Sequence, residues 1–323
     1  MRAAVTTKQG PPSVIEIMEV PIPDVKTGWI KIKVKAFGLN RSEIFTRKGD
    51  SPGVTFPRIQ GIECVGVVEE DPSGKLAKGQ QVAALMGGMG RFFDGGYAEY
   101  AVVPDSVVLP FESTLTWEVI GALPEMFQTV WGSLYQALEI ENEEVLLIRG
   151  GTSSIGMAAC QIARHQGLRV ISTTRNRDKE HLLRENGAHY VIIDKGKVEE
   201  SVRDLFPEGV DKVLELIGTA TLKDSLKCIR PKGMVCMTGI LGNEWTMAGF
   251  TPMGDIPSLG RLTVYMGEAS NLPPGAFQEY LDLVASREIR PNIHRVFGLS
   301  EIVEAHTYME SNQASGKLVV LVE

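Results

Sequence analysis

One stretch decides the fold: Val145-Leu146-Leu147-Ile148-Arg149-Gly150-Gly151-Thr152-Ser153-Ser154-Ile155-Gly156. An apolar segment of strand type leads into a loop of small residues, and a helix-length stretch, Ile155–Gln166, opens directly after it. The free amides of a helix's first turn and the helix dipole both favour an anion in such a loop. Gly151-x-Ser153-x-x-Gly156 is the dinucleotide-binding fingerprint with serine in place of the middle glycine.

We therefore predict that this loop holds the phosphates of a dinucleotide. The alternative is a tight strand-to-helix turn without a ligand. The Cβ of Ser153 lets the backbone approach a pyrophosphate less closely, but its hydroxyl can donate a hydrogen bond instead. The predicted phosphate-binding residues are Gly151, Thr152, Ser153, Ser154, Ile155 and Gly156.

The stretch belongs to a regular alternation of strands and helices. The expected strands are Val145–Arg149, Arg169–Thr174, Tyr190–Ile193, Lys212–Leu216, Met234–Thr238 and Leu262–Met266. Helix-length stretches lie between them, such as Lys179–Asn186 and Ala220–Cys228. This order predicts an α/β fold with a doubly wound parallel sheet, of which the Rossmann arrangement is the commonest six-stranded case.

The first part of the chain has a different pattern. Its expected short strands are Arg2–Thr6, Val14–Val20, Trp29–Ala36, Cys64–Glu69, Gln81–Leu85 and Tyr97–Val103. Alternation in Trp29–Lys35 puts lysines on one face and apolar residues on the other, as in a half-buried antiparallel strand. The tail ends in one more apolar strand, Leu318–Val322. We predict a β-rich domain of residues 1–117 and 290–323, and a Rossmann domain of residues 118–289.

Composition limits the classes of function. A net charge of −7 and a pI of about 5.5 disfavour non-specific binding to nucleic acid or to an anionic membrane. No apolar run approaches the roughly 18 residues that a membrane span needs. The four cysteines are scattered, without a Cys-x-x-Cys pair. A cytoplasmic, soluble protein without disulfides is therefore expected.

Charge at the end of the second Rossmann strand predicts the cofactor. NAD enzymes place an acidic residue there, about 20 residues after the loop, on the ribose diol. Here Thr174 is followed by Arg175, Arg177 and Lys179. A guanidinium matches a phosphate in a bidentate geometry, so these four residues predict the 2′-phosphate of NADPH. The alternative is a solvated basic turn that opens a helix.

Four segments resemble the medium-chain dehydrogenase/reductase superfamily over essentially the whole chain: Ala36-Phe37-Gly38-Leu39-Asn40-Arg41-Ser42-Glu43, Gly61-Ile62-Glu63-Cys64-Val65-Gly66-Val67-Val68, Gly95-Gly96-Tyr97-Ala98-Glu99-Tyr100 and the glycine loop. The resemblance is to its quinone oxidoreductase branch, and it implies a GroES-like substrate domain. Zinc alcohol dehydrogenases of the superfamily bind metal through a Cys in the first segment and a His in the second, where this chain has Asn40 and Ile62.

Composition supports a zinc-free site. All five histidines follow residue 164, and residues 65–159 contain no cysteine. A four-cysteine structural zinc lobe and a Cys/His metal site in the first domain are thus excluded. Each histidine is interpreted as a helix-face or surface residue.

The resemblance also implies site residues. Asn40 would lie in the substrate cleft, or else only open the helix Arg41–Arg47 as an N-cap. Thr129 matches a position near the nicotinamide, or is an ordinary helix threonine. Tyr97 is the nearest candidate for a general acid, although a core tyrosine is the alternative. Further backbone contacts to the nicotinamide are expected from Gly218, Gly239, Ile240 and Leu241.

Two departures from the branch concern the acceptor site. Phe45 and Ser51 stand where relatives often carry tyrosines, which disfavours an enoyl thioester reductase and leaves the proton donor unassigned. The apolar side chains that can line an acceptor pocket, or simply pack, are Phe45, Met86, Met89, Phe92 and Phe93.

Together these features predict hydride transfer from NADPH to a quinone or an activated enone, by positioning and without a Lewis acid. One rival is an enoyl or alkenal double-bond reductase. Another is a non-catalytic NADPH-binding protein, since some members of this branch are lens crystallins. A homodimer is expected from the resemblance alone.

Overall fold

The computed structural model describes residues 1–323 and divides them into two compact units. The first comprises Met1–Gln128 and Glu268–Glu323, and the second comprises Thr129–Gly267. The predicted boundaries, 117/118 and 289/290, differ from these. Helix α9 (Ala276–Ala285) belongs to the first unit because its Tyr280 stacks on Phe127, with 4.3 Å between ring centroids.

The second unit contains a six-stranded parallel sheet of order β11-β10-β9-β12-β13-β14. Its strands are β9 (Val145–Arg149), β10 (Arg169–Thr174), β11 (Tyr190–Ile193), β12 (Val210–Glu215), β13 (Ile229–Met237) and β14 (Arg261–Val264). This is the predicted doubly wound sheet, and the strand order reverses between β9 and β12. In such sheets ligands bind at the carboxyl ends of the strands near that reversal.

Helices cover this sheet through apolar side chains. They are α4 (Ser154–His165), α5 (Glu180–Glu185), α6 (Glu199–Leu205), α7 (Thr219–Lys227) and α8 (Pro252–Asp255). Helix α3 (Pro124–Trp131) spans the unit boundary and continues as a π-helical turn, Gly132–Ala137. Leu147 of β9 is in one apolar cluster with Val202 of α6 and Leu226 of α7.

The first unit is built on two sheets. A seven-stranded sheet has the order β15-β16-β3-β5-β6-β8, with β7 also on β3, and a three-stranded sheet has the order β2-β1-β4. The strands are β1 (Arg2–Thr6), β2 (Ile15–Glu19), β3 (Trp29–Gly38), β4 (Arg58–Ile59), β5 (Glu63–Glu70), β6 (Gln81–Leu85), β7 (Tyr100–Pro104), β8 (Val108–Pro110), β15 (Ile293–Gly298) and β16 (Lys317–Leu321). The alternation predicted for β3 is confirmed, since Ile30, Ile32 and Val34 are buried.

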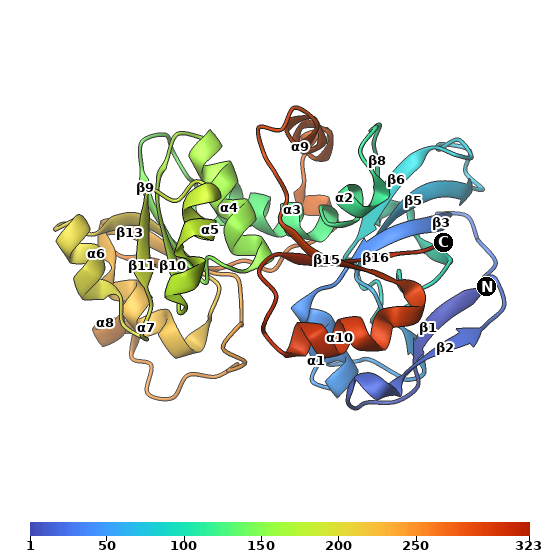
Figure 1. The fold of residues 1–323 in the computed structure, drawn as a ribbon, viewed down its shortest axis with the longest axis horizontal. Coiled ribbons are helices and arrows are strands. Elements are labelled where there is room, and N and C mark those ends of the chain that lie inside the picture. Colours follow the sequence, from blue (N-terminus) through green and yellow to red (C-terminus); the bar gives the residue numbers. More distant parts are fainter. The chain divides into compact units, whose positions relative to one another are not determined.

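The C-terminal tail completes the first unit as predicted. After β15 comes α10 (Ile302–Glu310), and β16 then lies beside β3 (Figure 1). The two strands pair antiparallel, with Val320 opposite Phe37. The unit's other helices are α1 (Arg41–Lys48) and α2 (Trp117–Gly121). Four single 3-10 turns lie in this unit, Pro12–Val14, Asp105–Val107, Ala269–Asn271 and Leu299–Glu301, and one lies in the second unit, Arg177–Lys179. All four cysteines are buried and unpaired, and no helix has the length and apolarity to cross a bilayer.

Candidate active site

The loop between β9 and α4 has the geometry of a phosphate site. Ser153 is the N-cap of α4: its Oγ accepts a hydrogen bond from the Gly156 amide at 3.0 Å and donates one to the Gly150 carbonyl at 2.8 Å. In this structure the proton of that hydroxyl is used inside the loop, so donation to a pyrophosphate, which stays a prediction, would require the hydroxyl to turn away from the Gly150 carbonyl.

Two glycines allow the loop to close on itself. A Cβ on Gly151 would overlap the Ser172 Oγ, and a Cβ on Gly156 would lie 2.6 Å from the Gly150 carbonyl oxygen. The amides of Thr152, Ser154 and Ile155 make no hydrogen bond within the protein. Three donors at the start of a twelve-residue helix are thus available to an anion.

The other predicted backbone contacts converge on the same edge of the sheet. A Cβ on Gly218 would lie 3.0 Å from the Gly239 carbonyl oxygen, and one on Gly150 would lie 3.3 Å from the Leu241 Cδ1. The amide of Leu241 is bonded to the Leu216 carbonyl at 3.0 Å, and that of Gly239 to the Glu215 carbonyl. The Gly239 and Leu241 carbonyls and the Ile240 amide therefore remain for a ligand, whereas the Gly218 and Ile240 carbonyls accept amides of the protein.

The basic segment after β10 carries free cations. Thr174 closes a small turn through hydrogen bonds of 3.2 Å to the amide and the carbonyl of Asn176. Arg175 and Arg177 are exposed, and the side chains of Arg175, Arg177 and Lys179 make no hydrogen bond or ion pair with another residue. No carboxylate of the protein neutralises these groups, so their charge is available to an anionic ligand.

In the first unit, Asn40 is held in a buried ionic cluster. Its Oδ1 accepts a hydrogen bond from the Lys317 ammonium at 2.6 Å, and its Nδ2 donates to Glu63 Oε1 at 2.9 Å. Glu125 also lies 3.3 Å from that ammonium. Asn40 occupies the N-cap position of α1, as the alternative interpretation predicted, and its backbone amide donates to Glu43 Oε2 at 2.7 Å. Lys317 and Glu63 thus fix the orientation of the amide, which the sequence alone did not predict.

A second buried chain passes through Tyr97. The Tyr97 hydroxyl lies 2.6 Å from Glu43 Oε2 and 3.0 Å from His306 Nε2, and Arg47 lies 2.7 Å from His306 Nδ1. Tyr97 is fully buried and stacks on Phe37. Burial raises the pKa of this hydroxyl well above its ordinary value. Tyr97 is therefore the core tyrosine of the alternative interpretation, and the assignment of a general acid to it is wrong.

His306 corrects the interpretation of the histidines. It is fully buried on α10, and burial, aided by Arg47, lowers its pKa from 6.5 to about 3. A neutral ring accepts from Arg47 through one nitrogen and donates to Tyr97 through the other. No sequence signal identified this role, because the partners come from α1, from the segment before β7 and from the tail.

Glu43 gives a prediction about pH. Burial raises its pKa from 4.5 to about 7, although the hydrogen bonds from Tyr97 and from the Asn40 and Ile62 amides oppose this shift. The native state therefore binds more protons than the unfolded state between these values, and stability falls as the pH rises through them. Relative to a Glu43→Gln variant, the wild type should lose unfolding free energy from pH 4.5 to pH 7. Urea unfolding at several pH values measures this difference; a difference that is flat or that grows with pH would contradict it.

The remaining predicted residues are dispersed. Thr129 lies on α3, where its carbonyl accepts a hydrogen bond from Ser133 Oγ at 2.7 Å. Ser51 Oγ lies 2.9 Å from Thr46 Oγ1. Met89 is fully buried in the core, and Phe93 packs on that core with its ring edge-on to Trp29, which supports packing rather than a pocket for these two. Met86 is also partly buried and packs against that core, Phe45 is half-buried, and Phe92 is exposed.

The positions that bind zinc in the alcohol dehydrogenases are occupied differently here. Asn40 is in the Lys317–Glu63 cluster, and the Ile62 amide donates to Glu43 Oε1 at 2.9 Å. No group of three His, Cys, Asp or Glu side chains is arranged to hold a metal ion.

Known proteins match this chain along its length. An alcohol dehydrogenase GroES-like domain model matches residues 26–113, and a zinc-binding dehydrogenase model matches residues 154–286. The quinone oxidoreductase of Mus musculus is 27% identical over 100% of this chain and 98% of its own. Among solved structures, an NAD-dependent alcohol dehydrogenase has a TM-score of 0.87 at 26% identity and 100% coverage of both chains. A 2-haloacrylate reductase has a TM-score of 0.85 at 25% identity and 99% coverage of both.

Fold, motifs and relatives agree on a class. The chain belongs to the medium-chain dehydrogenase/reductase superfamily, in its quinone oxidoreductase-like branch. It is an oxidoreductase of a family that binds a nicotinamide cofactor, as the glycine loop predicted.

Proposed function

We propose that this oxidoreductase transfers hydride from NADPH to a quinone or an activated enone without zinc. The observation that carries the choice of cofactor is the pair of unpartnered, exposed guanidinium groups of Arg175 and Arg177 after β10, with no acid at the strand end. A guanidinium matches the 2′-phosphate and leaves a plain ribose diol without its usual carboxylate acceptor. One similar structure is that of an NAD-dependent alcohol dehydrogenase, and this charge pattern argues against NAD as the cofactor here.

The cofactor-binding half fits a dinucleotide. When bound, NADPH supplies the hydride. We infer that the free amides of Thr152, Ser154 and Ile155 bind its pyrophosphate. The residues proposed to bind its 2′-phosphate are Thr174, Arg175, Arg177 and Lys179. Gly218, Gly239, Ile240 and Leu241 supply backbone at the sheet edge for the nicotinamide end.

The choice of acceptor depends on whether the product of hydride transfer needs a proton donor in the site. The Tyr97 hydroxyl is engaged by Glu43 and His306, and the Asn40 amide by Glu63 and Lys317. A quinone tolerates the lack of a general acid, since the anion formed by hydride addition is a stabilised phenolate. An enal or enone gives a more basic enolate and depends more on proton donation. Asn40 is proposed to contact the acceptor, and Thr129 is proposed to lie near the nicotinamide.

A comparison of acceptors tests this function. With NADPH and a metal chelator present, we expect turnover of a small quinone and weaker turnover of a straight-chain enal. Faster turnover of the enal, or of a 2-haloacrylate, would favour the double-bond reductase, to which the similarity with a 2-haloacrylate reductase lends support. Tight NADPH binding without turnover of any acceptor would favour the non-catalytic NADPH-binding protein. Loss of quinone turnover in the chelator would contradict zinc independence.

We also propose a homodimer that pairs through β14, the edge strand of the second unit's sheet. Val264 is 60% exposed there and Met266, just beyond it, 86% exposed. An edge strand with bare apolar side chains and unpaired backbone groups favours pairing with another strand. Val264→Lys is expected to convert a dimer to a monomer in sedimentation, whereas Val296→Lys on β15 should not. A monomeric wild type, or an unchanged mass for Val264→Lys, would contradict this proposal.

A further inference from the structure

A charged residue ends an apolar strand directly before the phosphate loop. Val145 and Leu147 of β9 belong to the apolar cluster with α6 and α7, and Arg149 is next on the same face of the strand. Its side chain is fully buried. A buried guanidinium is costly to desolvate, so it persists only where partners fix it in one geometry.

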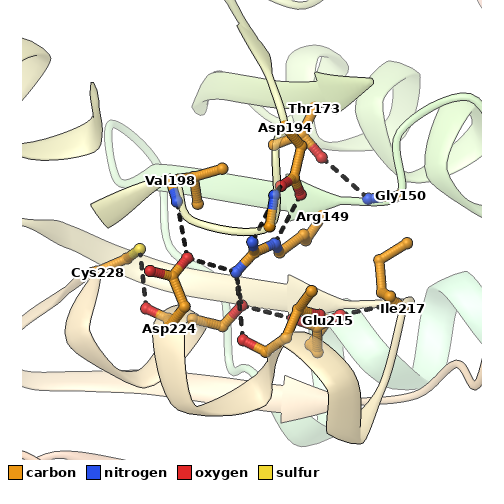
Figure 2. A network of polar contacts seen from close by, with 12 residues as sticks. Arg149, Gly150, Thr173, Asp194, Val198, Glu215, Ile217, Asp224 and Cys228 are labelled. Carbon is orange, nitrogen blue, oxygen red and sulfur yellow. Dashed lines mark hydrogen bonds and ion pairs between the residues drawn. The ribbon is translucent and has the colours of Figure 1, made fainter. Parts of the chain in front are cut away.

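Two carboxylates hold this guanidinium from opposite sides (Figure 2). The Nε and Nη2 atoms of Arg149 donate to the two oxygens of Asp194 at 2.8 and 3.1 Å. Its Nη1 donates to Asp224 Oδ2 at 2.7 Å, and also to the Thr221 carbonyl and the Ser225 hydroxyl. A planar fork can bind Asp194 through two parallel bonds and Asp224 at the same time, a geometry that an ammonium cannot match.

The partners of Arg149 in turn fix neighbouring backbone segments. Asp194, which follows β11, accepts the Gly196 amide at 2.7 Å, and Asp224 accepts the Val198 amide at 2.8 Å. The Ser225 hydroxyl donates to Glu215 at the end of β12, whose other oxygen accepts the amides of Ile217 and Gly218. Arg149 thus joins the carboxyl ends of β9, β11 and β12 to α7.

We propose that Arg149 is a positioning residue for the cofactor: it holds the end of β9 so that the loop presents the amides of Thr152, Ser154 and Ile155 to the pyrophosphate. This inference rests on the proposed dinucleotide site. The main chain enters the loop directly from Arg149, and Gly150 and Gly151 are anchored on the other side by Thr173, through its Oγ1 at 3.1 Å and its carbonyl at 3.0 Å. The Arg149 side chain is fully buried and bonded only to groups of the protein, so its effect must appear in binding that uses the loop.

The test compares two ligands in binding calorimetry. NADPH uses the pyrophosphate loop, whereas adenosine 2′-monophosphate reaches only the basic segment at Arg175. Arg149→Lys is expected to weaken NADPH by roughly tenfold to a hundredfold and to leave adenosine 2′-monophosphate unchanged. The matched control is Arg230→Lys, which alters an arginine–aspartate pair with Asp211 in the same unit and should affect neither ligand.

Each outcome decides the proposal. If Arg149→Lys lowers the melting temperature but leaves both dissociation constants unchanged, Arg149 only stabilises the fold and the proposal is wrong. Equal weakening of both ligands would mean a general disturbance and would also overturn it. If the wild type binds NADH but neither NADPH nor adenosine 2′-monophosphate, the proposal of NADPH as the cofactor is wrong. The role of Arg149 is then tested with NADH, which uses the loop, and adenosine, which does not: Arg149→Lys should weaken only NADH.

A second variant and a second measurement keep the proposal testable if Arg149→Lys does not fold. Asp194→Asn preserves volume and disturbs the same fork, so it should change the ratio of the two affinities in the same direction. Without cofactor, the Ser153 and Gly156 amides, which donate to the Gly150 carbonyl and to Ser153 Oγ, should exchange faster in either variant than in the wild type and at an unchanged rate in Arg230→Lys. Unchanged exchange and affinity in Asp194→Asn would overturn the proposal.

Discussion

Replacing Lys317 with methionine is expected to destabilise the first unit by about 3–5 kcal/mol. The Lys317 ammonium is 2.9 Å from Glu63 Oε1, and both side chains are buried, at 2% and 0% exposure. Burial alone would lower the pKa of Lys317, but the Glu63 and Glu125 carboxylates raise it above its ordinary value, so the group is a cation. Methionine fills much the same space but leaves the buried Glu63 carboxylate without its counterion.

Urea unfolding followed by circular dichroism measures this loss. Lys75→Met is the matched control, because its pair with Asp105 is 71% exposed at the lysine and such surface pairs contribute little. Adding Glu63→Gln to Lys317→Met should restore part of the lost stability, since it removes the uncompensated charge. A loss in Lys317→Met no larger than in Lys75→Met would show that the cluster does not hold a charged pair.

The second large effect concerns the cofactor. Arg175→Ala is expected to weaken NADPH binding by about 1.5–3 kcal/mol, the range for hydrogen bonds to charged groups. Binding of NADH should hardly change, because that cofactor has no 2′-phosphate for the guanidinium to contact. Since Arg175 is exposed and has no partner in the protein, its removal should not alter stability. A loss of preference for NADPH over NADH can therefore be distinguished from an effect on the stability of the fold.

Titration calorimetry with both cofactors checks this expectation. Arg184→Ala is a suitable control: this arginine is also exposed, on α5, but it pairs with Glu180 at 2.9 Å. It should leave both affinities unchanged. Equal losses for NADPH and NADH in Arg175→Ala would remove the support for the phosphorylated coenzyme.

Asn40, which stands where the zinc enzymes have a metal-binding cysteine, shows how tertiary contacts decide the role of a motif residue. The motif alone indicated Asn40 as a substrate residue or a helix cap. In the fold its amide lies between the Lys317 ammonium and the Glu63 carboxylate, which come from β16 and β5. Asn40 is therefore a fixed amide of known orientation, and any contact with substrate would involve a group that two buried charges already hold in place.

The sequence by itself determined the parallel sheet, the order of its strands along the chain and the loop at the end of β9. These features depend on local periodicity and on small residues at fixed spacing, which a linear pattern records directly. The exposed cations after β10 could also be predicted from the sequence, because solvent-facing charges at the end of a strand need no distant partner. Even the bounds of β1, β6, β9, β10 and β11 agree with those predicted.

Only the tertiary structure decided which polar groups are satisfied inside the protein. Tyr97, His306 and Arg47 lie far apart in sequence, as do Arg149 and Asp224, yet each set shares one buried site. Ser153 had the right position for a phosphate donor, but its proton goes to the Gly150 carbonyl. Burial makes an unpaired polar group expensive, so buried side chains take the partners that the fold brings to them, and a linear sequence does not specify which partners those are.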